Sequence, residues 1–181
     1  MGAMSIKINK KEYTIIKELG KGGFGRVVQV LSKSDNKNYA IKIIPIKGET
    51  KDKIKSLQSE SDILSKFNCN NIVKYYDSSK DGNNIYILME LCKGENLRSF
   101  IDKNMNDNTL IQEDILSNII SQLCMGIKEI HDKKIIHRDL KPENIFINEN
   151  MIIKIGDFGI SKQFNSYKTY TLTTKKLGTE N

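Results

Sequence analysis

Apolar residues gather in three short stretches near the start of the chain, and in one of them they alternate with polar residues. The stretches are Tyr13–Leu19, RVVQVL at 26–31, and YAIKIIPI at 39–46. Successive side chains of a strand point to opposite faces, so the alternation in RVVQVL predicts a strand, and the other two stretches also favour strands. The segments GKGGFG and SKSDNKN separate them and predict turns, which together indicate a β-meander.

The spacing of apolar side chains lengthens to three and four residues farther along. It predicts an amphipathic helix over 52–67 and a longer one over Glu113–His131. Between them, apolar runs at 72–76 and 85–91 flank the turn sequence KDGNN, which predicts a hairpin of two more strands. Another helical region begins in KGENLRSFI at 93–101, and the later runs IFI and IIKI predict short strands.

Strands therefore dominate the first half of the chain, and helices and loops the second. This order predicts an α+β fold with two lobes: a five-stranded antiparallel N-terminal lobe with one helix, and a helical C-terminal lobe. We place the first lobe at 5–93 and the second at 94–181, with a boundary near Cys92–Glu95 where Gly94 could hinge. Residues 1–4, MGAM, resemble a remnant of a removed tag.

Composition narrows the classes of protein that remain. The 29 Lys and Arg residues are interspersed with 22 acids, giving a net charge of +7 without a run of five like charges. This pattern lacks the clustered basic face and interleaved aromatic residues of a nucleic-acid-binding protein. Three distant cysteines and two histidines disfavour zinc and disulfides and predict a reducing, cytoplasmic setting. No apolar run reaches the length of a membrane span, and no signal peptide is visible.

The segment Gly20–Val27 is a first candidate for chemistry because it contains the spacing Gly-x-Gly-x-x-Gly. A dinucleotide-binding loop would open a helix, but a β-branched strand follows here, and the Gly-Lys-Ser/Thr of a P-loop is absent. Two interpretations stay open on this motif alone. One is a hairpin whose backbone N–H groups approach phosphate oxygens, and the other is a plain glycine turn.

Lys42 lies in the third predicted strand, next to that hairpin, and could reach phosphates as a point charge. A lone lysine on a strand is more often a solvated edge residue. Glu60, however, borders the apolar stripe of the first predicted helix, where a partly buried carboxylate needs a partner. The two residues together favour an ion pair beside the hairpin.

Two more motifs follow, HRDLKPEN at 137–144 and DFG at 157–159. With the earlier ones they appear in the order typical of eukaryotic protein kinases, and the chain resembles that family over about 13–179. The resemblance implies transfer of the ATP γ-phosphate to a protein substrate in the presence of Mg²⁺. Lys141, two residues after Asp139, is similar to the serine/threonine-specific branch of the family.

The resemblance also implies a role for each site residue. Asp139 would accept the substrate proton and Lys141 would steady the phosphoryl group, while Lys42 would pair with Glu60 and with the ATP phosphates. Mg²⁺ would be held by Asn144 and Asp157. The other residues assigned to ATP are Leu19, Gly20, Gly22, Gly25, Val27, Ala40, Met89, Glu90, Cys92 and Phe146. From the residues alone, the apolar members of this set are equally compatible with an ordinary core.

The resemblance further implies that His137 packs in a column with Leu64, Tyr75 and Phe158 and takes no part in proton transfer. It suggests regulation by a phosphate that pairs with Arg138. The candidate acceptors are Thr169, Thr171, Thr173, Thr174 and Thr179, of which Thr179 aligns better with a substrate-facing position.

Within the family, the motifs resemble both the stress kinases that phosphorylate a translation initiation factor and the NIMA-related kinases. The segment NIVKYY at 71–76 and the hinge LMELC at 88–92 favour the first group.

The family pattern continues beyond Thr179 with helices that this sequence does not contain, so the resemblance implies an incomplete C-terminal lobe. It also predicts an exposed apolar face on the helix at 113–131, which favours self-association or a completing partner. An ATP-binding module that does not turn over protein substrate is therefore the alternative to an active kinase.

Overall fold

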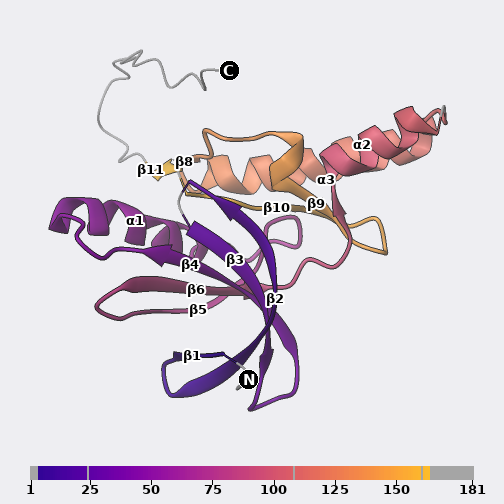
Figure 1. Cartoon of the computed structure of the whole chain (residues 1–181). Coiled ribbons are helices and arrows are strands. Elements are labelled where there is room, and N and C mark those ends of the chain that lie inside the picture. The colour runs from indigo at the N-terminus through magenta and orange to yellow at the C-terminus, as the bar shows by residue number, and fades with distance from the viewer. Residues whose placement is uncertain (1–3, 24, 108, 160, 164–181) are drawn as a thin grey trace.

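The structure is a computed structural model of the chain and describes residues 4–23, 25–107, 109–159 and 161–163. In Figure 1 the strands of the first half form a strongly curved sheet, and the second half lies along one side of it. The strands are β1 (Ser5–Ile8), β2 (Lys11–Gly22), β3 (Gly25–Ser32), β4 (Asn38–Pro45), β5 (Tyr75–Lys80), β6 (Asn84–Glu90), β7 (Glu95–Asn96), β8 (Ile135–Ile136), β9 (Ile145–Ile147), β10 (Ile153–Ile155) and β11 (Lys162–Gln163). The helices are α1 (Lys51–Leu64), α2 (Leu97–Asn106), α3 (Glu113–Asp132) and a 3-10 turn at Pro142–Asn144.

The main sheet has six antiparallel strands in the order β1-β2-β3-β4-β6-β5, with α1 in the connection between β4 and β5. The predicted α+β class and the antiparallel sheet with one helix are confirmed. The sheet has one strand more than predicted. The extra strand, β1, is only four residues long, and its two apolar residues are too few to predict a strand. Its turn to β2 uses Asn9 and Lys10 at φ 43° and 72° and contains no glycine to mark it.

The strand predicted at 72–76 was misplaced, because β5 runs from Tyr75 to Lys80. Its sequence ends in the polar residues DSSK, which show no apolar alternation. The apolar pair Ile72 and Val73 is buried by a different contact. The Val73 amide donates to the carbonyl of Ile155 at 2.9 Å, and the Ile155 amide donates to Asn71 at 2.9 Å. These bonds join the segment between α1 and β5 to β10.

Strand β4, at the centre of the main sheet, is buried on both faces. Ile44 of β4 packs with α1, α3 and Phe158 in one core, whereas Ile41 and Ile43 pack with β1 and β3 in a second core. This arrangement explains why YAIKIIPI is almost continuously apolar, since a strand covered on both sides has no solvated face.

The two outer strands of this sheet, β1 and β5, lie side by side (Figure 1). The side chain of Asn9 donates to the carboxylate of Asp77 at 2.8 Å and to the carbonyl of Ser78 at 3.3 Å. The sheet is therefore rolled, and its edges are joined at the turn between β1 and β2.

The long helix α3 agrees with the predicted segment to within one residue at its end. Its inner side buries Ile119 and Ile130, while Leu116, Ile120 and Met125 are 46%, 51% and 58% exposed. Leu116 and Ile120 lie four residues apart on one side of α3 and form the expected exposed apolar face, whereas Met125 lies on the opposite side. Among the helices of the described residues, none is both long enough and apolar enough to cross a bilayer.

Gly94, which the sequence suggested as a hinge, follows the last strand of the main sheet. Its φ is +128°, and a Cβ atom added there would lie 2.1 Å from the carbonyl oxygen of Ile147 in β9. A side chain is excluded by both the backbone angle and the close approach. The connection between the two halves of the chain is thus held tightly against β9 at this point.

Candidate active site

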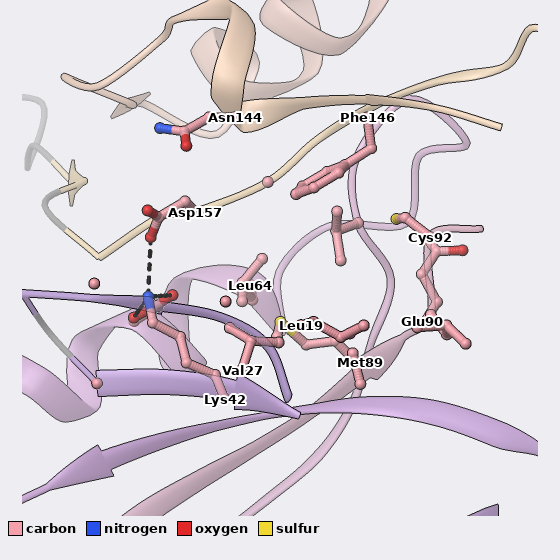
Figure 2. A pocket seen from close by; sticks show the side chains of 18 of the residues that line it. Leu19, Val27, Lys42, Leu64, Met89, Glu90, Cys92, Asn144, Phe146 and Asp157 are labelled. Atoms are coloured by element: carbon pink, nitrogen blue, oxygen red, sulfur yellow. Dashed lines mark hydrogen bonds and ion pairs between the residues drawn. The ribbon is translucent and has the colours of Figure 1, made fainter. Parts of the chain in front are cut away.

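A cavity of about 350 Å³ lies between the glycine-rich hairpin of β2 and β3, the end of β6, and the loops around β9 and β10 (Figure 2). All eleven residues that the sequence assigned to ATP line it, together with Glu60 and both residues assigned to the metal. The lining set also contains residues that sequence reasoning did not assign to it: Lys21, Gly23, Leu64, Val73, Leu91 and Gly156. Leu91 lies between two assigned residues, whereas Val73 lies next to none, and the orientation of neither side chain could be predicted from the motifs.

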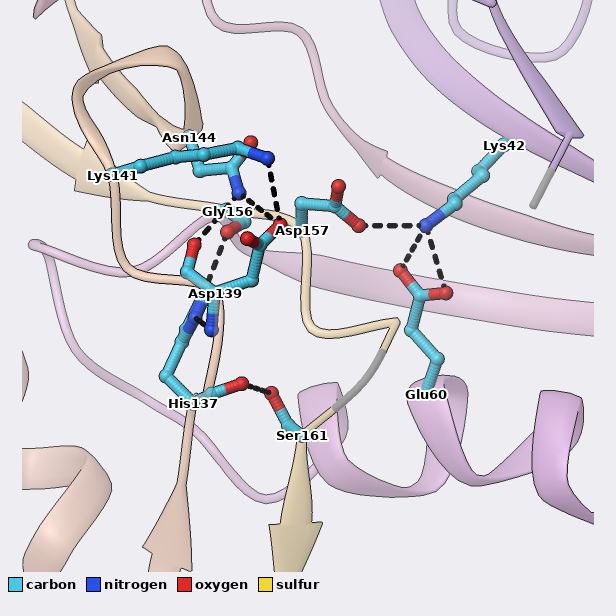
Figure 3. A network of polar contacts seen from close by, with 9 residues as sticks. All are labelled: Lys42, Glu60, His137, Asp139, Lys141, Asn144, Gly156, Asp157 and Ser161. Atoms are coloured by element: carbon cyan, nitrogen blue, oxygen red, sulfur yellow. Dashed lines mark hydrogen bonds and ion pairs between the residues drawn. The ribbon is translucent and has the colours of Figure 1, made fainter. Parts of the chain in front are cut away.

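Lys42 of β4 stands at the centre of a charge cluster at one side of the cavity, in which Lys42 and Glu60 are buried and the Asp157 side chain is 43% exposed (Figures 2 and 3). Its ammonium donates to both carboxylate oxygens of Glu60 at 2.7 and 2.9 Å, and to Asp157 at 2.9 Å. Lys42 and Glu60 are 8% and 3% exposed. The ion pair expected between Lys42 and Glu60 is present, and Asp157 adds a third charge from the other half of the chain.

The pKa values in this cluster follow from burial and charge. Burial by itself lowers the pKa of Lys42, but the charges of Glu60 and Asp157 outweigh it and raise that pKa. Burial raises the pKa of the Glu60 carboxyl, and Lys42 opposes the rise. For Asp157, burial also acts to raise the pKa, but Lys42 and the amide of Gly159 lower it. The cluster therefore keeps a charged lysine and an ionised Asp157 at neutral pH.

Apolar side chains form the opposite end of the cavity. Val27, Ala40, Met89 and Phe146 line it, and Phe146 stands across from the sheet in Figure 2. A flat slot walled by such groups suits a planar heteroaromatic ring.

The hinge segment at this end is fixed by Glu90. Its carboxylate accepts the backbone N–H of Lys74 at 2.7 Å and pairs with the ammonium of Lys154 at 2.8 Å. The neighbouring Cys92 thiol is largely buried, and burial followed by the charge of Glu90 raises its pKa to about 12. The thiol therefore stays protonated and contributes as a small apolar group.

Asp139, Lys141 and Asn144 form a second cluster in the loop between β8 and β9 (Figure 3). The amide nitrogen of Asn144 donates to the Asp139 carbonyl at 2.8 Å and to its carboxylate at 2.9 Å, and Lys141 approaches the same carboxylate at 3.1 Å. The contact with Asp139 is the main cause that raises the pKa of Lys141. The carboxylate is about one-third exposed, so it is both oriented and accessible.

His137 connects this loop to the strand that leads to Asp157. Its Nε2 donates to the carbonyl of Gly156 at 2.9 Å, and its Nδ1 accepts the backbone N–H of Asp139 at 3.3 Å. Both bonds are made together only by the neutral Nε2–H tautomer. Burial lowers the pKa of His137, against opposing effects of Gly156 and the nearby acids. The ring stacks edge-on against Phe158 at 4.6 Å, so its position is that of a packed structural residue.

Asn144 and Asp157 carry the oxygen atoms that could face a cation. Because Asn144 directs its amide nitrogen to Asp139, its oxygen points toward Asp157 in Figure 2. Two protein oxygen ligands fit Mg²⁺, which completes its coordination with water and phosphate oxygens. Among the described residues there is no cluster of three or more His, Cys, Asp or Glu side chains that could hold a metal by itself.

The expected phosphorylation switch lies mostly outside the part of the chain that the structure describes. All five candidate threonines fall within 164–181, outside the described residues. Arg138 is exposed and has a φ of 68°.

Comparison with known proteins identifies the class to which this geometry belongs. The family model described as protein kinase domain matches residues 13–181. The chain therefore belongs to the protein kinase domain family, whose members use ATP and a divalent metal ion and act on protein substrates.

Similar proteins carry serine/threonine kinase names. The chain is 34% identical over 169 residues to serine/threonine-protein kinase Nek1 of Mus musculus, covering 93% of this chain and 14% of that protein. It is 38% identical over 159 residues to probable serine/threonine-protein kinase nek2 of Dictyostelium discoideum, covering 85% and 38%. It is 39% identical over 145 residues to serine/threonine-protein kinase pakG of the same organism, covering 80% and 12%.

These relatives favour the NIMA-related kinases. The hinge sequence had instead favoured the initiation-factor kinases. The chain spans well under half the length of the relatives it matches. What the whole protein does is therefore a matter for proposal.

Proposed function

We propose that the chain is the nucleotide-binding and catalytic part of a serine/threonine protein kinase. The observation that carries the proposal is the convergence of two clusters at one cavity. The Lys42–Glu60–Asp157 cluster lies at its inner side, and the Asp139–Asn144 cluster lies beside Asp157 (Figure 3). A site for phosphoryl transfer needs cations for the phosphates and an acceptor for the hydroxyl proton at neighbouring positions.

ATP is the proposed occupant of the cavity. Its adenine would lie between the aliphatic side of Val27 and Ala40 and the ring of Phe146, with the backbone of 90–92 at its edge. The phosphates would extend under the glycine-rich hairpin toward Lys42, whose ammonium is held in place by Glu60. This placement supports roles for the whole set of residues that the sequence assigned to ATP.

Mg²⁺ is the proposed metal, held by Asn144 and Asp157. When bound, it would neutralise charge on the ATP phosphates and keep them oriented. The hydrogen bond from Asn144 to Asp139 would then give one residue two tasks, since its nitrogen orients the base and its oxygen faces the metal.

The proposed reaction transfers one phosphoryl group. The oxygen of a serine or threonine side chain attacks the γ-phosphorus, the bond from that phosphorus to the bridging oxygen breaks, and ADP leaves. Asp139 accepts the hydroxyl proton, and the ammonium of Lys141, 3.1 Å from Asp139, lies where it could stabilise charge on the transferred group. Loss of a positioned base is expected to slow the reaction by about 10²–10⁴-fold.

Asp139→Asn is the direct test. With Mg-ATP and a basic protein substrate, the native chain should transfer label, and the variant should transfer at least about 100-fold less. Asp132→Asn is the matched control, because it changes an exposed aspartate at the end of α3. Equal transfer by the native chain and Asp139→Asn would overturn the assignment of the base.

The alternative function, an ATP-binding module without turnover, gives a different pair of results. Mg-ATP would then raise the melting temperature of the chain while no substrate became labelled. If Mg-ATP gave neither stabilisation nor transfer, both interpretations would be wrong.

We further propose that the protein works in the reducing cytoplasm and that the apolar face of α3 is covered by another copy or by a partner protein. The support for the first is that Cys69, Cys92 and Cys124 are all free thiols. The support for the second is the exposure of Leu116 and Ile120 on one side of that helix.

A further inference from the structure

The rolled main sheet encloses its own core, and the two ends of that core differ. At one end, near the start of β4, three rings fill the space. Tyr13 and Tyr39 pack edge to face at 6.1 Å, and Tyr39 and Tyr76 do so at 5.2 Å. At the other end, near Ile43 and Pro45, the described residues that line the space include a single ring, that of Tyr86.

A second cavity, of about 380 Å³, opens at that other end. It is separate from the nucleotide cavity and lies among β1, β2, β3, β4 and the start of β6. Its lining residues are Met4, Ser5, Ile6, Ile15, Lys21, Gly25, Arg26, Ile43, Pro45, Asn84 and Tyr86. The mouth of a rolled sheet is a common place for small-molecule sites, and this volume lies within their usual range.

The lining has an apolar part and a cationic part. Ile6 and Ile43 are 7% exposed each and form the inner wall. The only charged residues among those lining the cavity are Lys21 and Arg26, which face each other across the β2–β3 pairing. Asn84 and Tyr86 add hydrogen-bonding groups.

Two acids lie near this cationic part and limit its charge. Arg26 approaches Glu18 at 3.6 Å, and the hydroxyl of Tyr86 donates to Asp81 at 2.9 Å. Lys21 makes no salt bridge within the part of the chain that the structure describes. Glu18 therefore offsets the charge of Arg26, and Lys21 remains as the uncompensated cation of the lining among the described residues.

We propose that this cavity binds a small amphiphile with an aliphatic body and one anionic head group. The body would replace water against Ile6, Ile15 and Ile43, and the head group would lie near Lys21 and Arg26. Lys21 and Gly25 also line the nucleotide cavity, so the ligand would contact the same hairpin from its other face.

Octanoate, used below its micelle-forming concentration, is a suitable probe, and octanol is its uncharged counterpart. In the chain labelled at isoleucine methyl groups, NMR should show octanoate shifting the signals of Ile6, Ile15 and Ile43. The signal of Ile120 on the exposed face of α3 should not move. Octanol should bind more weakly than octanoate. Shifts at Ile120 without shifts at the cavity would mean adsorption to α3 and would overturn the proposal.

Two substitutions with opposite effects test the charge. Arg26→Gln should weaken octanoate binding by about two- to fivefold, the usual size of one exposed charge interaction. Glu18→Gln should strengthen it, because it removes the acid that competes for Arg26. Lys33→Gln, an exposed cation at the far end of β3, should change nothing. Thermal unfolding without ligand verifies that each variant folds, and equal binding by all of them would overturn the proposal.

Discussion

At the scale of single residues, Lys42 is the group on which the buried charges depend. Lys42→Met leaves Glu60 buried at 3% exposure without a cation. Removing one partner of a buried pair is expected to lower the free energy of unfolding by about 3–5 kcal/mol. The loss should be smaller in acid. Burial raises the pKa of Glu60, and without Lys42 nothing of opposite charge opposes that rise, so a protonated Glu60 stabilises the variant.

Urea unfolding of Lys42→Met at several pH values tests this expectation. The deficit relative to the native chain should grow as pH rises through the raised pKa of Glu60. In the double variant Lys42→Met/Glu60→Gln the extra pH dependence should disappear. A deficit that stays constant with pH would show that Glu60 does not titrate in this range.

His137 gives a second pH effect, of opposite sign. Burial lowers its pKa below the ordinary histidine value of about 6.5, so the unfolded chain binds a proton that the folded chain rejects. Stability should therefore be fully present above about pH 6.5 and should fall as pH drops through the lowered pKa. His137→Phe, which keeps a ring against Phe158, should remove this dependence.

Chemical denaturation between about pH 5 and 7.5 measures the effect. His131→Gln is the matched control, because His131 lies exposed in the last turn of α3. That control should keep the acid dependence of the native chain. If both variants behaved alike, the assignment to His137 would be wrong.

At the scale of elements, Gly94 decides how closely the chain approaches β9. Gly94→Ala should lower the free energy of unfolding by at least about 2 kcal/mol, because it adds backbone strain and a contact 2.1 Å from the Ile147 carbonyl. Gly48 also has a positive φ, +82°, but no atom lies within 4 Å of its added Cβ. Gly48→Ala should therefore cost only about 1 kcal/mol, the strain alone. Thermal or urea unfolding compares the two, and equal losses would contradict the close approach.

The elements also show what the sequence could predict. β3 alternates clearly, β4 is a short apolar run, and α3 has a wide apolar stripe, so their positions could be predicted from these patterns. β5 ends in DSSK because its exposed side needs no apolar residues, and no pattern could mark it.

The candidate site was predicted largely through its motifs, each of which is short and local. The contacts that the motifs did not reveal are long-range. Glu90 contacts Lys154 because the fold brings them together, and no spacing in the sequence predicts this pair. The second cavity likewise depends on how β1 packs over β3 and β4. Periodicity gives the face of a strand but not the curvature of the sheet that contains it.

At the scale of the whole molecule, the exposed apolar residues Leu116 and Ile120 of α3 should govern association. The native chain should self-associate with rising concentration, and Leu116→Glu/Ile120→Glu should remain monomeric, because it places charge where two apolar side chains are about half exposed. Sedimentation velocity over a range of concentrations measures this. Ser117→Glu, which adds charge without removing an apolar group, should associate like the native chain. A native chain that stays monomeric throughout would contradict the prediction.

The charge cluster around Lys42 is completed in two steps as the chain is synthesised. Its two acids are added at different times, because Glu60 is 18 residues from Lys42 along the chain and Asp157 is 115 residues away. During synthesis the rolled sheet and α1 can emerge with Lys42 and Glu60 already neutralising each other, which permits their burial. Asp157 joins later and brings one uncompensated negative charge. The nascent N-terminal half can thus fold with the charges of Lys42 and Glu60 neutralising each other. The extra negative charge, which favours a bound cation, is added only when the catalytic half is synthesised.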